Sequence, residues 1–104
     1  MSECVLVLVA PPSLEAALVD WLLERVPAFS SFPIAGHGSA HAELSLSEQV
    51  EGRQAQVLFW VQLTHAEATR VTQEISARFN HVELHYWMLP VLASGRTGSA
   101  PSGG

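Results

Sequence analysis

"VLFWVQLTHAEATRVTQEISARF", residues 57–79, joins a strand directly to a helix and thereby decides the fold. Its first seven residues are mostly β-branched, aromatic or leucine, which is typical of a buried strand. Thr64 and Glu67 have the spacing of a capping box, the pattern that starts a helix. The helix that follows has one apolar face, formed by Ala68, Val71, Ile75 and Phe79. We therefore predict a strand over 57–63 and an amphipathic helix that begins after Thr64.

The rest of the chain repeats this strand and helix unit and adds two strands to it. Residues 5–10 predict a buried strand, and Pro12 and Ser13 open a helix that ends at Pro27. The apolar face of this helix is expected to hold Leu14, Ala17, Leu18, Trp21 and Leu22. Further strands are expected over 29–34 and 82–92.

The order strand, helix, strand, strand, helix, strand is that of the ferredoxin-like split βαβ fold. The sequence thus predicts an α+β domain over residues 3–92, with a four-stranded antiparallel sheet and two helices on one face. The small and polar residues 93–104 are expected to form a disordered tail.

The predicted strands are apolar on both faces, although two helices on one side of a sheet cover only one face. Leu58 and Trp60 alternate with Phe59 and Val61, for example, where an antiparallel sheet with one wet face shows polar residues at every second position. We therefore expect the second face to be buried against other copies of the chain.

A polar stretch, "GHGSAHAELSLSEQVEGR" at residues 36–53, interrupts this apolar pattern between the second and third strands. Gly36 and Gly38 favour a loop, and Ser45 with Glu48 forms a second capping box that predicts one helical turn. We interpret residues 37–55 as a long, partly ordered insert that carries the candidate functional site.

The composition excludes several classes of function. The net charge is −5 and the five arginines are scattered, whereas nucleic-acid binding requires a basic face. A single cysteine, Cys4, excludes disulfides within the chain, and we interpret it as a buried hydrophobe or a soft metal ligand. No Ser, His, Asp triad or phosphate-cradling glycine motif is evident, so no catalytic residue is predicted and we expect a non-enzyme. The first apolar run ends at Pro11, far short of a membrane span, which favours a cytoplasmic protein without membrane insertion.

Three stretches carry a resemblance to a known family: "PPSLEAALVDWLLE", "FSSFPIAGHGSAHAELSLSEQVEGR" and "HYWMLPVL". Over residues 4–92 the chain resembles the PII-like superfamily, which includes the CutA proteins, and in particular an uncharacterised bacterial family often encoded beside heavy-metal efflux pumps. The resemblance implies a trimer whose sheets pack together and whose insert, the T-loop, projects outward. It also implies a membrane efflux protein as a partner. The chain departs from signalling PII proteins at 79–82, where "FNHV" replaces a Gly- and Lys-rich phosphate-binding loop.

The histidines suggest a metal site. Imidazoles suit Cu, Zn, Ni or Co, and His37 and His41 are four residues apart in the insert, with Glu43 and His85 as further candidate ligands. The alternative is that His37 and His41 are solvated or bond the loop backbone. His85 is expected to share a strand face with Glu83 and Trp87; if buried, it would pair with Glu83 or a backbone group, or lie at a subunit cleft.

Further residues of the insert are candidates for binding a ligand or a partner protein: Gly36, Gly38, Ser39, Glu48 and Arg53. Trp60, Tyr86 and Trp87 offer either a stacking surface for a base or core and interface packing. The leading hypothesis is a PII-like sensor in metal homeostasis. Two alternatives stay open: a nucleotide or small-anion sensor that binds in the intersubunit cleft, and an adaptor that uses no small ligand. No organic cofactor is predicted.

Overall fold

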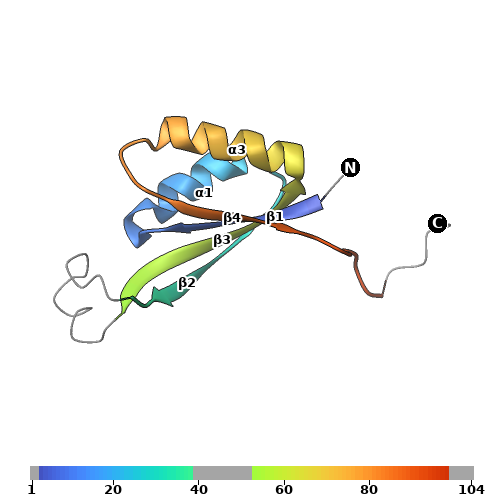
Figure 1. The fold of residues 1–104 in the computed structure, drawn as a ribbon, viewed down its shortest axis with the longest axis horizontal. Coiled ribbons are helices and arrows are strands. Elements are labelled where there is room, and N and C mark those ends of the chain that lie inside the picture. Colours follow the sequence, from blue (N-terminus) through green and yellow to red (C-terminus); the bar gives the residue numbers. More distant parts are fainter. Residues whose placement is uncertain (1–2, 39–52, 99–104) are drawn as a thin grey trace.

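The computed structural model describes residues 3–38 and 53–98. Its strands form one antiparallel sheet in the order β2-β3-β1-β4, and both helices lie on the same side of it (Figure 1). The elements are β1 (Glu3–Ala10), a 3-10 turn (Pro12–Leu14), α1 (Glu15–Leu23), β2 (Ser30–Gly36), β3 (Gln54–Thr64), α3 (His65–Arg78) and β4 (His85–Pro90). The predicted α+β class and ferredoxin-like topology are confirmed.

Helix α3 begins where the capping box predicted. The Thr64 backbone N–H donates to Glu67 Oε1 at 3.0 Å, and the Glu67 N–H donates to Thr64 Oγ1 at 3.2 Å. These reciprocal bonds satisfy two backbone donors that a helix start leaves open, so β3 passes into α3 without a connecting loop.

Helix α1 confirms its predicted apolar face except at one residue. Leu18, Trp21 and Leu22 are buried and Leu14 is half-buried, but Ala17 is exposed. Val19 instead packs against the core. The prediction for Ala17 was therefore wrong, because the buried stripe is centred on Leu18 and Ala17 falls at its margin.

The core lies between the helices and the inner face of the sheet. The two central strands supply alternate residues to it: Cys4, Leu6, Leu8 and Ala10 from β1, and Val57, Phe59, Val61 and Leu63 from β3. Leu84 and Met88 pack against its margin. Cys4 is buried, and burial raises the pKa of its thiol, as does the neighbouring Glu3 carboxylate to a smaller extent. The prediction that Cys4 is a buried hydrophobe is confirmed.

No helix of the described residues covers the outer face of the sheet (Figure 1), and the side chains on this face are mostly apolar. The register places Val7 between Trp60 and Trp87, and Trp60 pairs on its other side with Ser30. We call this surface the open face. Its large exposed hydrophobic side chains are Phe32 (41% exposed), Trp60 (44%), Trp87 (48%) and Leu89 (42%). The prediction that both faces are apolar is confirmed.

Strand β4 is shorter than the predicted 82–92, because Val82, Glu83 and Leu84 precede the paired residues and Val91 and Leu92 follow them. Tyr86 lies on the helix side of this strand, and His85 and Trp87 lie on the open face. No helix within the described parts of the chain is long and apolar enough to cross a membrane.

Candidate functional site

A polar hollow of about 410 Å³ lies at one end of the sheet. The end of β1, the start of β3 and the approach to β4 meet there, because antiparallel pairing sets Val9 opposite His85 and Ala10 opposite Val57. The hollow is lined by Val9, Ala10, Pro11, Gln54, Gln56, Glu83 and His85. We call it the β1–β3–β4 hollow.

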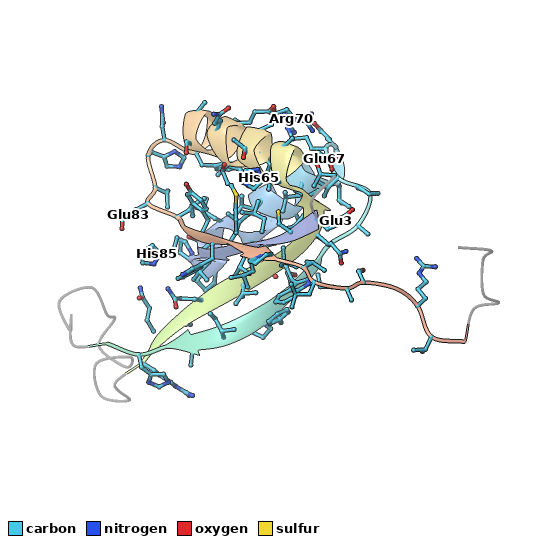
Figure 2. All side chains as sticks on the ribbon, turned by 45° about the vertical axis from the view of Figure 1, so that its right-hand side comes forward. Glu3, His65, Glu67, Arg70, Glu83 and His85 are labelled. Carbon is cyan, nitrogen blue, oxygen red and sulfur yellow. The ribbon has the colours of Figure 1, made fainter. Side chains whose placement is uncertain are left out.

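Two groups in this hollow are potential metal ligands. His85 is the first residue of β4 and Glu83 lies two residues before it, and Figure 2 shows them close together at this end of the sheet. Both are exposed, so a dissolved ligand can reach the carboxylate and the imidazole. The His85 ring lies 5.4 Å from the Trp87 ring, at an angle of 60°. The expectation that His85 shares a face with Trp87 is confirmed, but His85 is not buried.

The other two polar residues of the hollow come from β3. Gln54 pairs with Gly36 at the end of the β2–β3 ladder, and the Gln56 side chain lies over Gly36. A Cβ at position 36 would contact Gln56 Oε1, so glycine leaves room for this carboxamide. Gly36 is the last residue of β2, so it lies in a strand and not in the loop that the sequence predicted.

The charge of the hollow favours a cation over an anion. Glu83 is the one residue with formal charge among the lining residues, and no arginine lines the hollow in the described parts of the chain. Arg53 is exposed and precedes Gln54. A phosphate would therefore meet a carboxylate here without a lining guanidinium to offset it.

The structure describes only some of the predicted site residues. His37 and Gly38 are exposed directly after β2, whereas Ser39, His41, Glu43 and Glu48 lie outside the described residues, as does the predicted helical turn. Within the described residues no three His, Cys, Asp or Glu side chains come close enough to hold a metal ion. The convergence of His37, His41, Glu43 and His85 thus stays a prediction.

Sequence reasoning missed Gln54 and Gln56. Both lie on the open-face side of β3, where the register continues through Leu58 and Trp60. The alternation of side chains along β3 could have indicated them, because the residues on this face change from apolar to polar toward the start of the strand. The histidines outside the insert and the hollow, His65 and His81, are both exposed.

The comparisons with known proteins agree with this architecture. The crystal structure of a DUF3240 family protein from Shewanella baltica OS155 is similar, with a TM-score of 0.73 and 22% sequence identity. The match covers 94% of this chain and 99% of that one, so the two share a fold. Among curated proteins no significant match was found. The sequence model of DUF3240, a protein of unknown function, matches residues 1–98, and the chain therefore belongs to the DUF3240 family.

Proposed function

We propose that this protein is a non-enzymatic, homo-oligomeric sensor that binds a transition-metal cation in the β1–β3–β4 hollow. The observation that carries the proposal is that His85 and Glu83 both line a polar hollow that no arginine of the described chain lines. An imidazole nitrogen and a carboxylate oxygen are ligands that Zn, Co, Ni and Cu accept.

A complete site needs a third or fourth ligand beyond this pair. Gln54 and Gln56 line the same hollow, although carboxamide oxygens are weak ligands for these metals. The insert leaves and re-enters the sheet at the paired residues Gly36 and Gln54, which are at this end of the sheet. We propose that His37, His41 or Glu43 completes the coordination, and that metal binding thereby fixes the insert.

We further propose that copies of the chain assemble through the open face. Taking about 150–250 Å² for each large aromatic side chain, the exposed fractions of Phe32, Trp60, Trp87 and Leu89 leave roughly 350 Å² of apolar area in water. At about 25 cal/mol per Å², its burial is worth on the order of 9 kcal/mol per subunit before the costs of association. Small domains bury a limited share of their own surface, and oligomerisation is one way in which they gain further burial.

The resemblance to PII-like proteins supports a trimer among the possible assemblies. It also supports a cytoplasmic setting and an efflux protein of the membrane as the partner that the insert contacts. In this arrangement the metal ion is the signal, and the conformation of the insert is the output.

Metal titration of matched histidine variants tests the proposal. Isothermal titration with Zn and Ni, and absorption spectra with Co, should show saturable binding by the native chain, weakened at least tenfold in His85→Ala and in Glu83→Gln. His81→Ala and His65→Ala serve as controls, because both side chains are exposed outside the hollow. Binding that is equal in all five proteins would refute the hollow as the metal site.

Two further variants test the other parts of the proposal. A His37→Ala, His41→Ala double variant measures what the insert contributes to the affinity. If nucleotides raise the melting temperature and Arg53→Ala abolishes the rise, while metals have no effect, the ligand is an anion and the metal proposal fails.

A further inference from the structure

A second hollow, of about 290 Å³, lies between α3 and β4 on the helix side of the sheet. Its floor is formed by buried core residues, Leu8, Ile75 and Phe79, and its rim includes Ser76 and Tyr86. The full lining is Leu8, Thr72, Ile75, Ser76, Phe79, Asn80, Val82, Glu83, Leu84 and Tyr86. We call it the α3–β4 hollow. It is mostly apolar and has one formally charged residue, Glu83.

The segment that follows β4 carries an apolar side chain that is exposed to solvent. Residues 91–98, which we call the C-terminal arm, run away from the helices and the sheet (Figure 1). Leu92 in this arm is 99% exposed. The arm is tied to the sheet at its beginning, where the Val91 N–H donates to the Glu3 carbonyl at 3.2 Å and Gln62 Nε2 donates to Ser94 Oγ at 2.9 Å.

Leu92 cannot reach the α3–β4 hollow of its own chain. The hollow is at the start of β4, beside Glu83 and Leu84, and the arm leaves after Pro90 at the other end. A strand of this length spans about 20 Å, whereas Leu92 is two residues, or about 7 Å of extended chain, beyond its end. An occupant of the hollow from this segment must come from another molecule.

We propose that Leu92 of one copy inserts into the α3–β4 hollow of a second copy. The hollow has room for an isobutyl group and adjoining backbone, and it offers the apolar contacts that Leu92 lacks in its own chain. The charges also match, because Arg96 is the one charged residue of the arm and Glu83 that of the hollow. The inference rests on the self-assembly that the proposed function includes.

This contact is head to tail, since the arm and the hollow are different surfaces at opposite ends of β4. A contact of this type closes into a ring when the rotation between copies permits it. Each subunit of the ring then donates one arm and receives one, in addition to any contact through the open face.

Cross-linking between copies tests the contact directly. In a Leu92→Cys, Ser76→Cys variant, mild oxidation should join separate chains into covalent oligomers on a non-reducing gel. Leu92→Cys with Ala77→Cys is the control, because Ala77 is exposed on the same helix but does not line the hollow. The native Cys4 is buried and does not compete for these cross-links.

Affinity measurements give a second, independent readout. Leu92→Ser should weaken self-association about 10- to 100-fold in sedimentation, as expected for the loss of one buried leucine per contact. Leu23→Ser should have no such effect, although Leu23 is also a well-exposed leucine. The arm contact alone is overturned if the native chain forms oligomers but the Leu92→Cys, Ser76→Cys variant does not cross-link and Leu92→Ser does not weaken association. A native chain that stays monomeric would overturn self-assembly altogether.

Discussion

A charge placed on the open face should dissociate the assembly without unfolding the subunit. Leu89 is the most suitable position, because it lies at the end of β4, pairs with Val5 and is 42% exposed in the single chain. Complete burial of a leucine is worth about 1.5–3 kcal/mol, so covering the exposed part contributes roughly 0.6–1.3 kcal/mol per subunit. Leu89→Glu loses this gain and forces a carboxylate out of water, which costs several kcal/mol more.

The lost burial of Leu89 and the cost of taking a carboxylate out of water add up to about 4 kcal/mol or more per subunit, which corresponds to association at least about 1000-fold weaker. Sedimentation velocity over a range of concentrations measures this, and circular dichroism checks that the variant is folded. Leu23→Glu is the matched control, because Leu23 is 62% exposed on α1, away from the open face. A folded Leu89→Glu protein that assembles as tightly as the native chain would show that the open face is not the interface.

Three further predictions concern the stability and reactivity of the subunit. Hydrogen bonds from the backbone and side chain of Thr64 hold the pKa of Glu67 below its ordinary value. The ionised carboxylate therefore stabilises the fold at pH values above the ordinary pKa. This stabilisation is lost as the pH falls through the lower pKa of the folded chain. Glu67→Gln should reduce the fall of the melting temperature at acid pH, and an unchanged fall would contradict the assignment. Cys4 should resist thiol reagents at pH 8 until urea unfolds the chain, since burial shields it and raises its pKa; rapid labelling of the folded chain would disprove this. Arg25→Met should lower the free energy of unfolding in urea by about 1 kcal/mol, because the Arg25 guanidinium lies 3.9 Å from the centre of the Trp21 ring and donates to the Trp21 carbonyl at 2.9 Å; no change would mean that this contact is not stabilising.

The fold was predictable because several local signals agreed. The capping box at Thr64 predicted the start of α3, and two-residue alternation in β1 and β3 divided their side chains between two apolar faces. Ala17 shows the limit of this reasoning. Spacing places it 100° from Leu18 around the helix, and whether a residue at that margin is buried depends on the partner surface. Local sequence carries no information on that surface.

The site was less predictable, and His85 shows why. The sequence placed His85 within an apolar strand and left two alternatives open, a buried imidazole with a local partner or a position at a subunit cleft. The structure exposes His85, because β4 is an edge strand and no helix in residues 3–38 and 53–98 covers the open face. Gln54 and Gln56 were overlooked because a glutamine in a strand is polar without being a typical ligand. They became relevant only when the register brought them beside Glu83 and His85.

His85 connects the two parts of the proposed function, since it belongs to both surfaces. It lines the β1–β3–β4 hollow, and its ring lies 5.4 Å from Trp87, which we propose to be covered by another copy. A metal ion bound to this imidazole would lie at the edge of the proposed interface, so its binding free energy would differ between the single and the assembled chain. Linkage makes the effect reciprocal: a metal ion that binds the assembly more tightly also tightens the assembly by the same factor. Self-association measured with and without zinc should therefore differ in the native chain and coincide in His85→Ala, which would make assembly itself part of the metal response.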